Sequence, residues 1–291
     1  MARRRIMRIG ALNIKTHPHS DDLYKDLLND VFSSGRGMKI LGSTWGMIGS
    51  LQEDKDNDKT ILFGTIYKFL NIDPNEPWLN LETREVVKDE NGKFVQPISE
   101  NLKPNLKEIY YVFYPNKHRM FFESDILSPG MAIKLMDSLF SQEKIRKKYG
   151  IVDVEIETST EAIVKILSIH NLSKLEIKIS KPNPGDVLDE DDEAKVFKRF
   201  EKIKARKLNE QWTGEKDKGL DPDDEMKMLM RVASSNGSVT AEGYGIDDQK
   251  VTESTKSHPR IIKDDYDPDV HLGQSFFKSL ASRMYESLTR N

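Results

Sequence analysis

The chain has 291 residues and contains no cysteine. This absence excludes disulfides, thiolate metal sites and cysteine nucleophiles, and it favours a reducing cytoplasm as the protein's location. No apolar run approaches the ~20 residues that a membrane-spanning helix requires, so we expect no membrane insertion. The apolar stretch behind the basic start is broken by Arg8, Asn13 and Lys15, which argues against a signal peptide.

The sequence also lacks the common catalytic fingerprints. It has no Gly-x-Ser-x-Gly elbow, no Walker loop and no dinucleotide-binding glycine motif. We therefore expect no cofactor. The net charge is −3, so any attraction to nucleic acid must come from local clusters of basic residues.

What the sequence does contain is a series of amphipathic segments typical of an α+β protein. Apolar alternation predicts strands, and apolar spacing of three and four predicts helices. The expected strands are 6–15, 38–51, 60–70, 109–114, 119–123, 152–158 and 174–180, and the expected helices are 20–33, 128–149, 159–170, 192–210, 221–235 and 273–290. We expect mixed or antiparallel sheets with helices packed on one face, arranged in two lobes.

Composition changes abruptly in "KPNPGDVLDEDDEA", residues 181–194. This change predicts an α+β N-terminal domain over 1–185 and a charged, helix-rich C-terminal region with a small hairpin over 186–291. Phe276 and Phe277 in the final helix either close the protein's own core or form an interface.

The segment "KTHPHSDD" (15–22) has two interpretations. His17, His19 and Asp21 resemble the start of a metallo-hydrolase site, which needs further converging ligands. Alternatively, Ser20 caps a helix and the two aspartates lie at its positive end. We favour the helix start, because it explains Ser20 and both aspartates, but it leaves the histidines unexplained.

A weaker enzymatic hint is "LEIKI" in the strand 174–180. Glu176 and Lys178 alternate with apolar residues and should share one face, as in two-metal nucleases with an aspartate on a preceding strand. Asp153 or Glu155 would supply that carboxylate. The simpler interpretation is a half-buried strand with a charged outer face.

The strongest basic segment is "KVFKRFEKIKARK" (195–207). At helical spacing it combines an apolar stripe with exposed cations, a design that can present charge to phosphates. The alternative is a solvated helix face balanced by the acidic run before it. The candidate phosphate contacts are Lys198, Arg199, Lys202, Arg206 and Lys207.

Two smaller clusters extend this prediction. Lys144, Arg146, Lys147 and Lys148 end a predicted helix, where the dipole also favours cations. The turn "NKHR" should expose Lys117 and Arg119.

Several longer segments carry a resemblance to a known family. They are "ALNIKTHPHSDDLY", "FGTIYKFLNIDPNEPWLN", "VFYPNKHRMFFE", "LSKLEIKISKPNPGD", "SNGSVTAEGYG" and "KVTESTKSHPRII". The series resembles an uncharacterised bacterial domain-of-unknown-function family over nearly the whole chain. That family has no assigned chemistry, so it assigns no role to any residue here.

A more distant likeness concerns layout. The stretch "IHNLSKLEIKISKPN" is similar in pattern to the phage-exclusion protein RexA. This resemblance implies a two-lobed, dimeric, sequence-tolerant DNA-binding protein in antiviral defence.

Together these features favour a non-enzymatic, cytoplasmic nucleic-acid-binding protein in bacterial phage defence. DNA is expected rather than RNA, with a homodimer and a defence-system protein as further partners. The alternatives are a metal-dependent nuclease or hydrolase, and an interaction module of a defence complex.

Overall fold

The computed structural model describes residues 4–73, 76–94, 99–183, 192–215 and 218–289. The strands are β1 (Arg5–Lys15), β2 (Met38–Leu41), β3 (Thr44–Asp56), β4 (Lys59–Leu70), β5 (Lys107–Tyr114), β6 (Arg119–Glu123), β7 (Asp153–Ile156), β8 (Asn171–Ser180), β9 (Lys207–Thr213), β10 (Gly237–Tyr244), β11 (Lys250–Ser254) and β12 (Ile261–Tyr266). The helices are α1 (Asp21–Ser33), α2 (Pro129–Phe140), α3 (Glu143–Tyr149), α4 (Thr160–Leu167), α5 (Asp192–Ile203), α6 (Asp224–Asn236) and α7 (Gly273–Thr289), with short 3-10 turns at Pro115–Lys117 and Thr255–Ser257.

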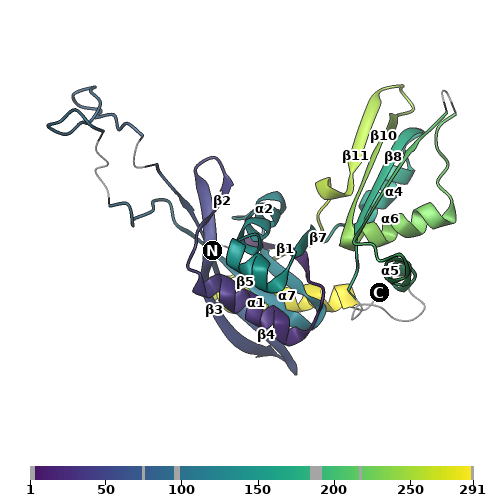
Figure 1. Cartoon of the computed structure of the whole chain (residues 1–291), viewed down its shortest axis with the longest axis horizontal. Helices are drawn as coiled ribbons and strands as arrows, with labels where there is room; N and C mark the ends of the chain where they lie inside the picture. The colour runs from purple at the N-terminus through teal and green to yellow at the C-terminus, as the bar shows by residue number, and fades with distance from the viewer. Residues whose placement is uncertain (1–3, 74–75, 95–98, 184–191, 216–217, 290–291) are drawn as a thin grey trace.

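The strands form two antiparallel sheets (Figure 1). The first has the order β12-β1-β6-β5-β4-β3-β2, with β7 also paired to β1. The second has the order β11-β10-β8-β9. The α+β class and the antiparallel sheets expected from the sequence are confirmed.

Helices cover both faces of the first sheet. On one face α1, α2 and α3 enclose a large core that includes Tyr24, Leu135 and Ile145. On the other face α7 packs Phe277 and Met284 against β1, β5 and β6. The expectation of helices on one face alone is therefore wrong for this sheet, because α7 supplies a second apolar layer. Phe277 is fully buried and so belongs to the protein's own core.

In the second sheet the helices do lie on one face. Alternate residues of β8, including Leu175 and Ile177, pack with Phe200 of α5 and Met230 of α6. The opposite face carries the polar residues of β8. We call the first sheet with α1, α2, α3 and α7 the first lobe, and the second sheet with α4, α5 and α6 the second lobe (Figure 1).

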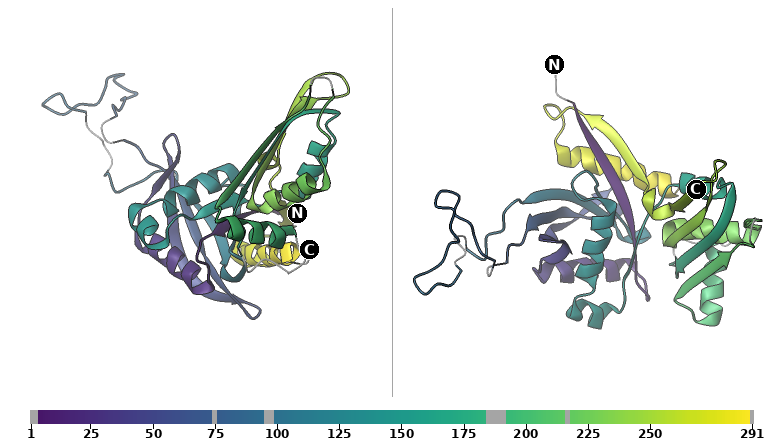
Figure 2. Two further views of the ribbon diagram at one scale, coloured as in Figure 1. Left: turned by 45° about the vertical axis from the view of Figure 1, so that its right-hand side comes forward. Right: turned by 90° about the horizontal axis from the view of Figure 1, so that it is seen from above.

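The lobes do not follow the domain division expected from the sequence. The predicted boundary at residue 185 lies outside the described residues. Strand β8, before it, pairs with β9 and β10, which follow it. Strand β12 and helix α7 return to the first sheet (Figure 2). Composition marked a connection in the chain, whereas strand pairing across that connection decides which residues share a core.

Four element predictions need correction. The strand expected over 38–51 is two antiparallel strands, β2 and the first part of β3. The helix expected over 192–210 ends at Ile203, and the chain then forms β9. The helix expected over 128–149 is two helices, α2 and α3. Strand β12 was not predicted, because "IIKDDY" offers few apolar residues. Among the described residues, no helix is both long enough and apolar enough to cross a membrane.

Candidate functional site

Buried polar residues concentrate where the two lobes meet. They come from β1, from the end of β7, from the end of β8 and from the junction of α6 with β10. We call this group the seam and define it as Asn13, Lys15, Glu157, Thr158, Ser180 and Asn236, with the half-buried Ser235 and with His118 and Arg119 from the β5–β6 turn. The seam joins the first lobe to the second lobe.

Lys15, the last residue of β1, is completely buried in the seam. Its Nζ donates to Asn236 Oδ1 at 2.9 Å, to Ser180 Oγ at 3.1 Å and to the Ser180 carbonyl oxygen at 3.3 Å. Burial lowers the pKa of Lys15 to about 8, although the nearby carboxylates of Glu155 and Asp153 oppose this shift. One amine of the first lobe thus holds three acceptors of the second.

The lowered pKa of Lys15 predicts a pH-dependent stability. Below pH 8 the folded and unfolded chains both carry this ammonium, so its contribution is constant. Between pH 8 and its ordinary value of 10.5 the unfolded chain binds more protons, so the free energy of unfolding should rise with pH. Urea unfolding at about pH 7.5 and about pH 9.5 should show the wild type gaining stability relative to Lys15→Met. Identical pH responses of the two proteins would contradict the shift.

The β5–β6 turn is buried, which corrects the expectation that it is exposed. His118 has no exposed surface, and Arg119 is only 9 % exposed. The Arg119 Nε lies 2.6 Å from Oε1 of Glu157, whose other oxygen accepts from Ser235 Oγ at 2.9 Å. Nδ1 of His118 lies 2.7 Å from Oδ1 of Asn13. Packing of this turn beneath the second lobe takes Arg119 away from solvent, so it cannot serve as a phosphate contact.

The segment 15–22 is both a helix start and part of the lobe junction. Ser20 Oγ accepts from the Leu23 amide at 3.2 Å, which confirms the predicted cap. His17 Nε2 lies 3.3 Å from the Lys181 carbonyl oxygen, and burial together with Lys181 lowers the pKa of His17. The His19 ring packs edge-on against His118 at 5.5 Å.

No metal cluster includes these histidines. Asp21 lies exposed in the first turn of α1. Across the described ranges, no group of three or more His, Cys, Asp or Glu side chains could hold a metal ion. His17 contacts the Lys181 carbonyl and His19 Nδ1 lies 3.3 Å from Asn183 Nδ2, both just beyond β8 of the second lobe. These contacts account for the two residues that helix capping leaves unexplained.

The carboxylates proposed for a nuclease site are engaged separately. Glu176 and Lys178 share a face of β8, as alternation predicts, and form an ion pair of 2.9 Å. Asp153 of β7 instead accepts from Arg206 Nη2 at 2.9 Å. Glu155 accepts from Ser180 Oγ at 3.2 Å. The nuclease pattern requires these carboxylates to converge on one metal site, whereas Glu176, Asp153 and Glu155 each contact a different partner.

Arg206 and Lys207 of the second basic cluster contact the segment that follows α3. Arg206 begins the second lobe's β9 segment, and its Nη2 contacts the Ile151 carbonyl oxygen at 3.4 Å, just beyond α3. Lys207 Nζ lies 3.4 Å from Asp153. These contacts bring the start of β9 against the end of α3. We call this region the junction surface and define it as Lys144, Arg146, Lys147, Lys148, Ile151, Lys202, Ile203, Arg206 and Lys207.

The cations of the junction surface differ in availability. Lys147 pairs with Glu143, and Lys148 pairs with Asp30. Arg206 and Lys207 share Asp153. Within the described part of the chain, three exposed cations of the junction surface have no carboxylate within ion-pair distance: Lys144, Arg146 and Lys202.

The remaining predicted phosphate contacts are not part of the junction surface. Arg199 of α5 pairs with Glu225 of α6 at 3.3 Å. Lys198 is exposed on α5, and Lys117 is half-buried in the β5–β6 turn. Exposed ion pairs contribute about 0–1 kcal/mol, so a phosphate can displace the carboxylate from a residue such as Arg199.

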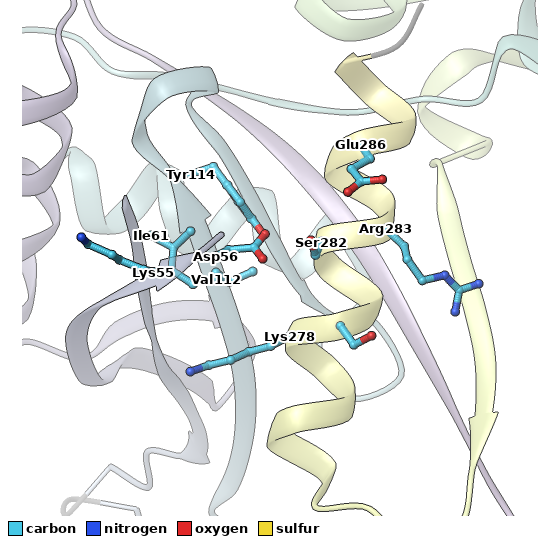
Figure 3. A pocket seen from close by; sticks show the side chains of 10 residues that line it. Lys55, Asp56, Ile61, Val112, Tyr114, Lys278, Ser282, Arg283 and Glu286 are labelled. Atoms are coloured by element: carbon cyan, nitrogen blue, oxygen red, sulfur yellow. The ribbon is translucent and has the colours of Figure 1, made fainter. Parts of the chain in front are cut away.

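A cavity of about 290 Å³ lies between α7 and the β3–β4 hairpin (Figure 3). Tyr114 Oη donates to Asp56 at 2.6 Å, and burial raises the pKa of Tyr114. Lys278 pairs with Asp54 at 2.5 Å, and Arg283 pairs with Asp264 at 2.6 Å. In the close view Arg283 points away from the centre of the cavity. Two cations that line the cavity, Lys278 and Arg283, are therefore paired with the protein's own carboxylates.

Sequence reasoning missed the seam. Asn13 and Lys15 occupy alternate positions in the second half of β1, which is otherwise apolar from Ile9 onward, and this was the available signal. Asp137 of α2 was also missed: burial, and then Glu155 and Asp153, raise its pKa to about 6. The carboxylates Asp153 and Asp137 lie near Lys207, so this end of the junction surface is less positive than α3.

Comparison with known proteins bears on the family alone. No curated protein matches the chain. Residues 5–282 match the family described as Domain of unknown function (DUF4747), a span that includes both lobes, the seam and the junction surface. The chain therefore belongs to this family.

Proposed function

We propose that the protein binds nucleic acid at the junction surface, through backbone phosphates, and does not cleave it. The observation that carries this proposal is the contact between Arg206 and the Ile151 carbonyl, which brings the basic segment 198–207 to the chain just beyond the basic helix α3. Clustered lysines and arginines supply salt-dependent affinity without reading bases. The seam supports this surface, because it fixes α3 and β9 relative to each other.

The chemistry of the surface favours tolerance of sequence. Its available cations are Lys144, Arg146 and Lys202, which are exposed and can approach phosphates. Lysine acts on phosphates as a point charge and carries no preference for a base edge. We infer a duplex DNA ligand rather than RNA, and a role in bacterial antiviral defence in the cytoplasm with a further defence protein. The choice of ligand and of role follows the resemblance in sequence pattern to RexA around "IHNLSKLEIKISKPN".

Binding without cleavage can be tested with two unrelated duplexes of equal length. Fluorescence anisotropy at low salt should give affinities that agree within about threefold, because phosphate contacts do not depend on sequence. Gel analysis after incubation with Mg²⁺ or Mn²⁺ should show both duplexes intact. Cleavage that Glu176→Ala or His17→Ala abolishes would overturn the proposal in favour of a metal-dependent nuclease.

A further inference from the structure

The described residues of the connection between β4 and β5 (71–73, 76–94 and 99–106) extend from the body of the protein, and we call them the arm (Figures 1 and 2). Strands β4 and β5 are antiparallel neighbours, with Lys68 opposite Lys107. The Leu70 amide donates to the Pro104 carbonyl oxygen at 3.0 Å, so the two ends of the arm lie side by side. A turn of about two to five residues would join such strands. The arm is therefore longer than the connection between β4 and β5 requires.

The described part of the arm buries little of its own apolar surface. It has two isolated bridges, Leu79 with Val86 and Lys88 with Phe94, and no strand or helix. None of its described residues belongs to the protein's apolar cores. Six large apolar side chains are instead exposed: Leu79, Leu81, Val86, Phe94, Leu102 and Leu106. Long connections that expose apolar residues in this way are typical of interaction surfaces.

The arm is also acidic. Its described residues include seven carboxylates and four cations, which gives an acidic excess of three. A surface that fits it must be basic and must offer apolar contacts. The junction surface meets both requirements: Ile151 is 49 % exposed and Ile203 is 61 % exposed, and Lys144, Arg146 and Lys202 are exposed as well. Charge and apolar character are thus complementary between two parts of one chain.

The arm does not reach the junction surface of its own chain in this structure. In Figure 1 and in both views of Figure 2 the arm extends away from the body, on the side opposite the second lobe. We propose that the arm of one copy docks on the junction surface of a second copy, and that the reciprocal contact forms a two-fold dimer. Such an exchange uses the same patch twice, as closed two-fold dimers do. The arm then occupies the surface at which we propose that nucleic acid binds, so the two ligands compete.

Light scattering coupled to size exclusion tests the dimer without nucleic acid, independently of the proposed function. The full chain at low salt should have twice the 33.5 kDa mass of one chain. A variant with residues 72–103 replaced by a short Gly-Ser turn should be a monomer. Leu81→Ser with Phe94→Ser should also shift the protein to monomer, whereas Leu272→Ser, an equally exposed change outside the arm, should not.

The docking surface is tested by a variant of its own. Lys144→Glu with Lys202→Glu should convert the dimer to a monomer, because both substitutions repel the acidic arm. A monomeric full chain would overturn the proposal, as would a dimer that survives removal of the arm. A dimer that needs the arm but is unaffected by Lys144→Glu with Lys202→Glu would overturn the assignment of the docking surface.

Discussion

Replacing Arg119 with alanine should lower the free energy of unfolding by about 3–5 kcal/mol, the cost typical of breaking a buried ion pair by removing one partner. The reason lies in Glu157, which is 1 % exposed and 2.6 Å from Arg119 Nε. Without the guanidinium, the carboxylate stays buried, and the Ser235 hydroxyl still donates to it. Urea unfolding followed by circular dichroism measures the loss. Arg146→Ala, an exposed change on α3, should cost less than about 1 kcal/mol.

The same variant separates a stabilising role from a binding role. Without denaturant, and at a temperature where the Arg119→Ala variant is folded, the variant should bind duplex DNA with the affinity of the wild type. The reason is that the Arg119 side chain is buried and does not reach the DNA. The paired variant Arg119→Met with Glu157→Met should be more stable than Arg119→Ala, since it removes the stranded charge. A loss below about 1 kcal/mol in Arg119→Ala would contradict the seam as the support of the lobe junction.

Reversing the available cations of the junction surface should weaken duplex binding by at least about 100-fold at low salt. The variant combines Lys144→Glu, Arg146→Glu and Lys202→Glu. Each change removes a phosphate contact and adds repulsion, and none breaks an ion pair among the described residues. Fluorescence anisotropy with a labelled duplex measures the loss.

A matched control keeps the change in net charge constant. Lys39→Glu, Lys165→Glu and Lys263→Glu alter three exposed residues away from the junction surface. This control should bind within about threefold of the wild type, because interactions beyond about 10 Å are largely screened in 0.1 M salt. Equal losses in both variants would show that overall charge, and not this surface, governs binding.

Local patterns predicted most elements because each pattern has a local cause. The cap at Ser20, the alternation in β8 and the apolar stripe of α7 all depend on neighbouring residues. The end of α5 did not follow from local pattern, since "KIKARK" continues a helical composition while Lys204 adopts a positive φ of 56°. Pairing of β9 with β8 decides that outcome, and pairing is not visible in a single segment.

The candidate site was predicted only in part. The cations of α3 and of 198–207 were identified from charge, but their meeting at Ile151 depends on the arrangement of two lobes. The burial of Arg119 was not foreseen, because a turn rich in charge is ordinarily exposed. Its burial follows from packing between the lobes, where Glu157, the residue after β7, neutralises it. Long-range contacts of this kind leave almost no signal in composition.

The salt dependence of duplex binding tests the central claim most directly. Affinity should be measured for the wild type and for the Lys144→Glu, Arg146→Glu, Lys202→Glu variant at several salt concentrations between about 50 and 200 mM. The account predicts a linear plot of log affinity against log salt for the wild type, with a slope of magnitude about 3 or more, and a much shallower slope for the variant. Wild-type affinity that does not change with salt, or equal slopes for the two proteins, would contradict it.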